Sequence, residues 1–538
     1  MTTMIRNISL AMAMQLTSTL SSAQTPSERF DIDHFSIKGN TLLQASELEK
    51  VLQPYTGKQR EIGDVQRATE ALRLYYRNAG YSVTWVVAPE QDLDTGVVIL
   101  QVIEAHIGSI TIAGNHFFDD TNIRASLPTL SENIVPRAGD ISANTQLANE
   151  NPAKQVDVVL RPGAQPGMVD ATIDVIEVQP LKAFVTFDNT GNPQTGDFRL
   201  GVGLQHANLF NRDHIATLSY VTSPGNLDQV SIYSGSYRLP LYSLGDSIDV
   251  VIARSDVNAG TAETVAGPLT FSGKGDVLGL RYNQLLVRRG IYSHRLVYGL
   301  DYRAYENNCT LGAFGADGCG PASVDVTTRP VSVAYSGNWT LPGRISEFYI
   351  ALSRNIPGAI DGKAADFSAA VPGINNEPGA SSRYSIARFG ASVVNAFSNN
   401  WQVRAAFDAQ YTRDALVTGE QFSIAGATAV RGFLERSIAR DGGYYANLEL
   451  YTPNLAGRLV AGTGNLRGLV FYDMARAVNT RLRGELRQQE TIASIGAGIR
   501  WNIQRNFNLR FDLARLVNEG GDREVGDMRG NFSIYYGF

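Results

Sequence analysis

The chain has 538 residues, of which 43% are hydrophobic and 18% are charged, and its formal net charge is −5. This composition excludes an intrinsically disordered chain, and it argues against a nucleic-acid partner because phosphates are bound by a clear excess of basic side chains. No run of about 18 apolar residues occurs, so we expect no membrane-spanning α-helix.

The first 23 residues are typical of a secretory signal peptide. Arg6 supplies the positive charge, residues 8–16 form a modest apolar stretch, and residues 21–23 are small, as a cleavage site requires. The alternative is a disordered cytosolic N-terminus. We therefore expect a signal peptide over residues 1–23 and a short linker over residues 24–29.

Residues 30–106 are predicted to form a small α+β domain with the element order β-α-α-β-β. Ser46 and Glu49 have the spacing of a capping box ahead of a short helix, and residues 64–78 place apolar side chains at helical spacing. The expected strands lie within residues 30–40, 82–87 and 97–103.

Residues 107–179 repeat this element order. Helices are predicted near residues 120–126 and 143–149, and strand-like runs precede and follow them. A single irregular α+β domain is the alternative, but a Gly-Asn pair follows the opening strand of both segments. We therefore expect two small modules of one architecture in tandem.

From residue 180 to residue 538 hydrophobic residues recur at every second position, in place of the helical spacing seen earlier in the chain. Apolar and aromatic side chains alternate with charged, polar or glycine residues, as at the end of the chain, where Phe532, Ile534, Tyr536 and Phe538 share one face. A soluble β-sandwich also alternates, but persistence over most of the chain favours a transmembrane antiparallel β-barrel. At about 22 residues per strand and connection, this region predicts about 16 strands around an aqueous interior.

The two cysteines, Cys309 and Cys319, lie in a glycine-rich stretch typical of a surface loop. In an oxidising compartment they most simply form one small disulfide. A metal site is the alternative, but no further cysteine and no nearby histidine is available to complete it. The six histidines show no close ligand spacing, so we expect no metal and no cofactor.

Four stretches resemble the pore-forming partner of two-partner secretion systems, the ShlB-like haemolysin activators of the BamA-related superfamily. Residues 75–107 are similar to the end of that family's first periplasmic POTRA domain, and residues 149–177 to the NPxRxVxxxLxPGxxPG stretch of its second. Residues 188–214 resemble the opening hairpin of the barrel, and AVRGF at residues 429–433 resembles the superfamily's VRGF signature. The resemblance implies two POTRA domains ahead of the barrel.

The same resemblance places the VRGF tip in a loop, near residues 421–443, that folds into the barrel. The tip residues are Val430, Arg431, Gly432 and Phe433. In the superfamily this arginine pairs with an aspartate on the inner wall, and the matching strand VFYDMA offers Phe471 and Asp473 on one face. Only a few residues separate the predicted signal peptide from the first module, so we expect the plug helix that family members often carry to be absent and gating to depend mainly on this loop.

The POTRA domains are expected to capture an unfolded polypeptide by adding it as a strand to an open sheet edge. The family-like stretch supplies the candidate recognition residues, whose alternative role is to form turns and caps of the second POTRA domain. They are Asn149, Asn151, Pro152, Lys154, Pro162 and Gly163. The terminal aromatic Phe538 resembles the signal by which such barrels are recognised for assembly.

The predicted protein is thus a pore in the bacterial outer membrane, with periplasmic POTRA domains, that exports one large secreted partner protein. We expect outer-membrane lipid and the barrel assembly machinery as further partners, no nucleic acid, and no enzymatic activity. An outer-membrane protein insertase is an alternative, although most members have more than two POTRA domains. A barrel phospholipase is another, but no GxSxG elbow occurs in the chain.

Overall fold

The computed structural model describes residues 29–538 except 194, 228–229, 257–259, 263–268, 272–273, 307–323, 359, 460–463, 482–487 and 505. The predicted signal peptide lies outside the described residues, as do both cysteines of the predicted disulfide. The chain divides into two compact units, one ending at Ala105 and the other beginning at His106. Within the described ranges, no helix combines the length and apolar character needed to cross a bilayer.

The first unit is an α+β module with a three-stranded sheet of order β2-β5-β4. β2 runs parallel to β5, and β4 runs antiparallel to it. Leu48, Leu72 and Tyr76 of the helices are buried against Val98 and Leu100 of β5. The elements are β1 (Phe30–Ile32), β2 (His34–Lys38), α1 (Ala45–Leu52), η1 (Gln53–Tyr55), β3 (Gly57–Arg60), α2 (Ile62–Asn78), β4 (Thr84–Val87) and β5 (Val97–Glu104).

The capping box predicted at Ser46 and Glu49 is wrong. Helix α1 begins at Ala45, one residue after Gln44, and no side chain caps it. A capping box does occur on α2, where the Asp64 carboxylate accepts the backbone N–H of Glu61 at 3.0 Å. This hydrogen bond and the neighbouring Arg67 guanidinium lower the pKa of Asp64.

The second unit opens with a module of the same topology, in which the sheet order is β6-β8-β7. Helix α4 begins at Ala138, earlier than the helix predicted near residues 143–149. Gly139 in the first turn weakens the sequence signal there, because glycine is a poor helix former. The elements are β6 (His106–Ala113), α3 (Asp120–Ser126), α4 (Ala138–Ala148), β7 (Lys154–Pro162) and β8 (Met168–Glu177).

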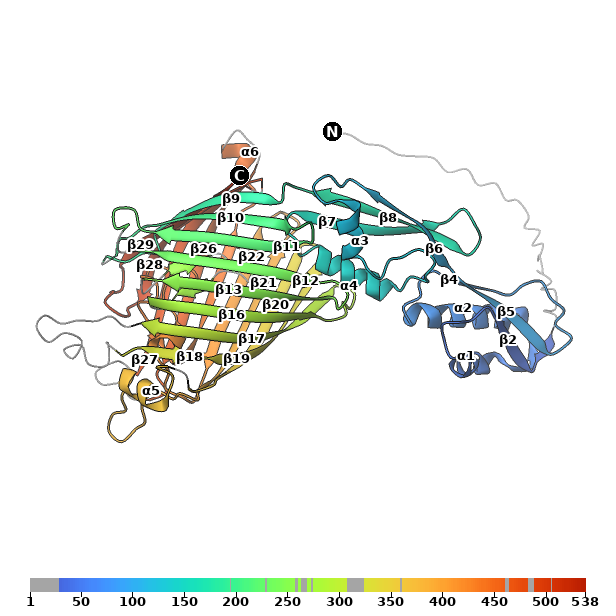
Figure 1. The fold of residues 1–538 in the computed structure, drawn as a ribbon, viewed down its shortest axis with the longest axis horizontal. Coiled ribbons are helices and arrows are strands. Elements are labelled where there is room, and N and C mark those ends of the chain that lie inside the picture. The colour runs from blue at the N-terminus through green and yellow to red at the C-terminus, as the bar shows by residue number, and fades with distance from the viewer. Residues whose placement is uncertain are drawn as a thin grey trace, which may run out of the picture. The chain divides into compact units, whose positions relative to one another are not determined.

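The remainder of the second unit is a closed antiparallel barrel (Figure 1). Among the described residues the barrel wall has 16 strand positions. The short β18 and the longer β19 both pair with β17 and share one of these positions. This confirms the predicted fold class. The strands are β9 (Leu181–Asp188), β10 (Arg199–Leu209), β11 (His214–Thr222), β12 (Ile232–Leu241), β13 (Asp246–Ser255), β16 (Lys274–Leu285), β17 (Tyr292–Glu306), β18 (Val326–Thr328), β19 (Pro330–Leu341), β20 (Arg344–Asn355), β21 (Ser385–Ala396), β22 (Gln402–Tyr411), β25 (Gly442–Tyr451), β26 (Asn465–Val478), β27 (Gln489–Ile503), β28 (Phe507–Asn518) and β29 (Met528–Gly537).

Side chains alternate between the two faces of the barrel wall as the period of two predicts. On β17, Tyr298, Leu300 and Tyr302 are exposed on the outside, whereas Asp301 is buried on the inside against Arg281 and Arg303. In lipid every backbone donor and acceptor needs a partner, and closure of the sheet meets that demand.

The two ends of the barrel differ in their connections. At one end the turns are short, and α4 contacts this end through Asn144, which donates to the backbone oxygen of Tyr242 at 3.1 Å. The longer connections lie at the opposite end. They include β14 (Gly260–Ala262), β15 (Leu269–Phe271), α5 (Ala364–Ala370) and the segment that carries the VRGF tip. The short helix α6 (Ala456–Leu459) belongs to a connection at the first end.

Candidate functional site

The segment between β22 and β25 folds back onto the inner wall of the barrel. Its two limbs pair as a short hairpin, β23 (Phe422–Ser423) with β24 (Ala439–Arg440). Apolar side chains of the loop are buried against wall residues of β26, β27 and β28. This cluster contains Ile424, Ala425, Val430, Phe433, Ile438, Ala475, Ala477, Ile492 and Leu516. The loop is therefore packed on the wall by apolar contact as well as by charge.

Arg431 at the loop tip lies beside Asp473, the residue predicted as its partner. The guanidinium Nε donates to Oδ2 of Asp473 at 2.7 Å, and Nη2 donates to Oδ1 at 2.7 Å. The guanidinium carbon also lies 3.5 Å from the centre of the Phe471 ring. Both side chains of the ion pair are at most 4% exposed. The contact is thus a buried, bidentate pair stacked on an aromatic ring.

Two further carboxylates complete the surroundings of Arg431. Glu449 lies 2.8 Å from Nη1 and Asp512 lies 3.4 Å from it. These acids are in turn paired with Arg404 at 3.2 Å and Arg500 at 2.9 Å respectively. Three guanidinium groups and three carboxylates form this arginine cage. The pairing balances the charge of a site that is largely removed from water.

The glycine of the tip is required by close packing. Gly432 has φ +101°, and a Cβ there would lie 2.7 Å from a methyl carbon of Leu516. Only glycine adopts this backbone conformation without strain. Phe433, which follows it, is 1% exposed. The tip residues Val430 to Phe433 thus all lie against the wall.

A second anchor of the loop was not predicted. Glu420, at the end of η4 (Thr418–Glu420), is 2% exposed and accepts hydrogen bonds from Arg303 and Tyr305, both at 3.0 Å, and from Thr328 at 3.1 Å. These partners lie on β17 and β18, more than 90 residues earlier in the chain. No local pattern marks a lone glutamate in a loop, so only the fold identifies this residue.

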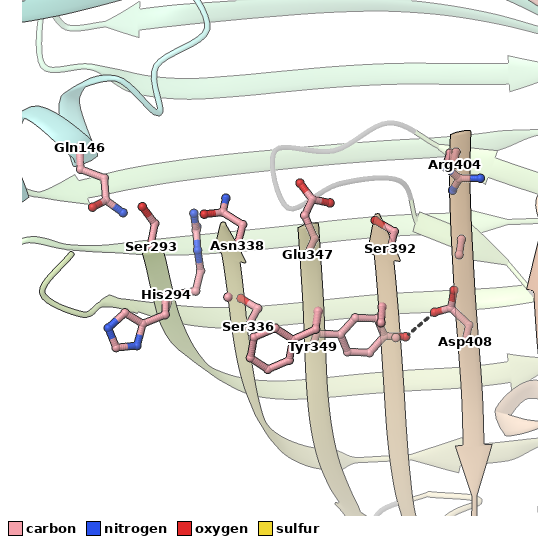
Figure 2. A pocket seen from close by; sticks show the side chains of 16 residues that line it. Gln146, Ser293, His294, Ser336, Asn338, Glu347, Tyr349, Ser392, Arg404 and Asp408 are labelled. Carbon is pink, nitrogen blue, oxygen red and sulfur yellow. Dashed lines mark hydrogen bonds between the residues drawn. The ribbon is translucent and has the colours of Figure 1, made fainter. Parts of the chain in front are cut away.

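The inner wall from β17 to β22 carries a polar hollow of about 440 Å³ near the end of the barrel that α4 contacts, and Arg404 of the cage is among the residues that line it. Figure 2 shows Ser293, Asn338 and Ser392 along this wall with Gln146 beside them, and Tyr349 donating to Asp408 at 2.9 Å. Hydroxyl and amide groups can exchange hydrogen bonds with a moving peptide backbone without binding any one sequence tightly.

The family-like stretch of the second module meets the barrel at a buried polar contact. Lys154 Nζ lies 2.6 Å from Asp213 Oδ2 and 2.8 Å from Asn122 Oδ1, and the lysine side chain is 0% exposed. The Tyr242 hydroxyl also donates to Asp213. Burial lowers the pKa of the Lys154 amine, and the Asp213 carboxylate offsets part of that shift. We call Lys154, Asp213, Asn122 and Tyr242 the junction.

The other predicted recognition residues lie in different surroundings. Asn151 donates to the backbone oxygen of Ala207 in β10 at 2.7 Å, and Asn149 exchanges two hydrogen bonds with the backbone of Val156. Pro162 ends β7 at an exposed position, and the N–H of Gly163 donates to Met168 across the turn. Pro152 follows Asn151 in the connection from α4 to β7.

Phe538 follows β29 and lies beside the first barrel strand. Its backbone exchanges two hydrogen bonds with Ala183 of β9, at 2.9 and 3.0 Å. The residue is 65% exposed, and its ring packs near Tyr536 on the outer face. The position is therefore at the seam where the barrel closes.

Comparisons with known proteins agree with this architecture. The model of the ShlB-type POTRA domain matches residues 30–105, and that of the haemolysin secretion/activation protein ShlB/FhaC/HecB matches residues 167–311 and 334–501. The outer membrane transporter CdiB of Dickeya dadantii (strain 3937) is 23% identical over 431 residues, which cover 78% of this chain and 72% of that protein.

Solved structures show the same fold. The structure of CdiB from Escherichia coli superposes with a TM-score of 0.76 at 18% identity, covering 97% of this chain and 93% of that one. CdiB from Acinetobacter baumannii gives a TM-score of 0.69 at 17% identity, with 98% and 95% covered. Because the second family match spans more than half of the chain, this protein belongs to the haemolysin secretion/activation family ShlB/FhaC/HecB and is an outer-membrane transporter of two-partner secretion.

Proposed function

We propose that this transporter binds its secreted partner unfolded in the periplasm and passes it through the barrel lumen to the cell surface. The observation that carries the proposal is the folded-in loop, which lies inside a closed barrel and is held there by the buried arginine cage. A lumen lined by paired charges and hydroxyl groups is hydrated, as an extended polypeptide requires. The proposal includes no catalytic step, metal or cofactor.

Capture begins at an open sheet edge of a POTRA domain. β4 is an edge strand of the first sheet, and its Trp85 and Val87 are 40% and 44% exposed. An extended chain that pairs with such an edge gains main-chain hydrogen bonds, and alternate side chains contact the apolar residues. In the second domain Lys154 is already paired with Asp213 in the junction, and Asn151 already donates a hydrogen bond to β10. Of the six predicted recognition residues, Pro162 and Gly163 are thus better placed to meet a substrate.

The loop acts as the gate. Opening requires Arg431 to leave Asp473, and Glu420 to leave Arg303 on a different part of the wall. Separating a buried ion pair is costly, which keeps the resting pore occupied by the loop. A substrate in the lumen offers replacement contacts to the polar wall. The exported protein then folds outside, which prevents its return.

The outer face supports two further partners. Its exposed apolar and aromatic side chains suit contact with outer-membrane lipid. The barrel assembly machinery is the proposed catalyst of insertion, with Phe538 at the seam as part of the signal that it recognises. A change of Phe538 to Ser should lower the amount of folded barrel in the outer membrane, measured by its heat-modifiable migration on gels.

Site-specific crosslinking tests the path through the lumen. A photoreactive residue replaces Ser392, which faces the polar hollow, or its neighbour Val393, which faces outward by strand alternation. The two variants are compared while export of the partner is stalled by a folded domain fused to it. The partner is first identified as the long secreted protein encoded beside this gene.

We expect the partner to crosslink at position 392 and not at position 393. Equal crosslinking at both positions, or none at 392 during export, refutes passage through the lumen. Crosslinks to several unrelated barrel proteins instead of one secreted partner would favour an insertase.

A further inference from the structure

Three arginines gather on the lipid-facing side of the barrel, at the end with the long connections. Arg354 of β20 is paired in register with Ser385 of β21, and Arg413 follows Tyr411, which is paired with Ala387. Antiparallel register places Arg354 beside Ser385, and Arg413, two residues past the end of β22, lines the same groove as both; these three residues form the row. Arg383 lies in the turn two residues before Ser385, and all three arginines are exposed.

The row sits at one interface of the membrane. Arg344 begins β20 on the same face as Arg354, and Phe348, Ile350 and Leu352 lie between them. Ten residues of strand extend about 33 Å, which at a tilt of about 40° spans about 25 Å across the bilayer, the height of the apolar band of such barrels. Arg344 and Arg354 thus mark opposite leaflets, with Arg354 in the outer one.

An apolar groove of about 750 Å³ runs down the wall beneath the arginines. Its floor is formed by the small side chains of Ser385 and Ala387 on β21. Leu352 on one side and Tyr411 on the other stand higher, with exposed fractions of 56% and 62%. A furrow of this shape on a lipid-facing wall fits a hydrocarbon chain.

A second hollow, of about 670 Å³, adjoins the groove above the row, and Arg413 and Asp414 line both. Its lining carries four cationic side chains, Lys363, Arg383, Arg413 and Arg481, against one carboxylate, Asp414. In the part of the chain that the structure describes, Arg354, Arg383 and Arg413 form no ion pair, and Arg413 Nε donates to the Tyr411 hydroxyl at 3.1 Å. Asp414 is itself engaged by the backbone N–H of Ser385 at 3.0 Å.

We propose that these two hollows form one binding site for a phosphorylated glycolipid of the outer leaflet, of the lipid A class. The acyl chain lies in the groove between Leu352 and Tyr411, and the phosphate is bound by Arg354, Arg383 and Arg413. Guanidinium groups bind phosphate through paired N–H donors, and in the absence of protein carboxylates they remain available for it. The occupant must combine hydrocarbon with anionic charge at the level of the headgroups, which excludes a soluble anion.

Native mass spectrometry of the full chain in detergent tests the site. The probe is bisphosphorylated hexa-acyl lipid A, compared with the same lipid without phosphates and with phosphatidylethanolamine. The charge variant combines Arg354→Gln with Arg413→Gln and removes two positive charges. The groove variant, Ala387→Trp, fills the groove. Arg344→Gln is the matched control, because it removes an exposed arginine from the same face of the same strand in the other leaflet.

We expect the charge variant to weaken lipid A binding at least about tenfold, because each arginine near an anionic headgroup contributes about fivefold. Ala387→Trp should weaken binding while leaving every arginine in place, and Arg344→Gln should change it less than twofold. Heat-modifiable migration confirms that each variant is folded, and the groove variant alone decides the question if the charge variant fails to fold. The proposal is overturned if the dephosphorylated lipid or phosphatidylethanolamine binds as tightly as lipid A. It is also overturned if Arg344→Gln weakens lipid A binding as much as the charge variant does.

Discussion

Removing the Arg431 side chain should release the folded-in loop from the barrel wall. In Arg431→Ala the loop loses both 2.7 Å bonds to Asp473 and the contact with the Phe471 ring. The carboxylates of Asp473, Glu449 and Asp512 then have only Arg404 and Arg500 as cationic partners. Breaking a buried ion pair in this way costs about 3–5 kcal/mol, which raises the population of the released loop by about 10² to 10⁴.

A buried cysteine at the loop tip reports that population. Ala429, which is 5% exposed, is replaced by cysteine after Cys309 and Cys319 have been changed to serine. The rate of labelling by a maleimide that does not cross membranes is then proportional to the released fraction. Arg431→Ala should raise this rate by the factor given above, and it should lower secretion while the barrel stays inserted.

Arg436→Ala is the matched control for this measurement. It removes an arginine from the same loop whose guanidinium, among the described residues, donates one hydrogen bond, to the backbone oxygen of Thr418 at 3.5 Å, and forms no ion pair, although Glu420 and Glu435 attract it from a greater distance. Because Arg436→Ala breaks no ion pair, its labelling rate should change by about fivefold at most, as for a typical point substitution of about 1 kcal/mol. A rate in Arg431→Ala that matches this control, in a folded barrel, would refute the idea that the cage holds the loop.

Three further predictions follow from other contacts. Glu420→Gln removes the charge that faces Arg303 and should raise the same labelling rate about tenfold or more, because a charge-assisted bond contributes about 1.5–3 kcal/mol. Lys154→Met leaves Asp213 buried without its cation and should loosen the junction by about 3 kcal/mol, seen as faster amide exchange in α4. Asp64→Asn should lower the free energy of unfolding of the separately expressed residues 29–105 by about 1 kcal/mol at pH 7.

Each of these results has a contrary outcome. Unchanged labelling in Glu420→Gln would mean that the second anchor does not restrain the loop, and unchanged amide exchange in Lys154→Met would mean that the junction does not stabilise the contact between module and barrel.

The pKa of Asp64 is lower in the folded state than its ordinary value of 3.8. Its contribution is therefore complete about one pH unit above 3.8 and is lost as the pH falls through 3.8 and then through the lower folded pKa, so the difference between parent and variant should shrink progressively in acid. A constant difference across this range would contradict the assignment.

The features that could be predicted from sequence are those that repeat along the chain. The period of two in the last two thirds reflects a wall with lipid on one side and water on the other, and the barrel follows from it. Helix α2 was predicted because Val65, Ala68, Leu72 and Tyr76 occur at the helical period and are buried together. The Arg431 and Asp473 contact was expected from family resemblance rather than from the residues alone.

The features that were missed depend on partners far apart in the chain. Glu420 meets Arg303 only because the register of the sheet brings β17 to the place where the loop enters, 117 residues later. Lys154 of β7 meets Asp213, in the turn between β10 and β11, across 59 residues because the second module packs against that end of the barrel. The cap of α1 was mispredicted on a local motif, since Ser46 lies inside the helix instead of before it. Local spacing does not encode such contacts.

The seam between β29 and β9 constrains the order in which this barrel can be built. Only five registered pairs, Ser533 with Asp188 through Gly537 with Phe184, join the two strands, and Asn189 reaches Gly530 across 341 positions of the chain. β9 is synthesised before the rest of the barrel. One of its edges therefore stays unpaired until β29, the last strand, has been synthesised and has reached the membrane. During that interval the unpaired edge can pair with other chains and aggregate. We therefore expect assembly to need a chaperone that shields the early strands.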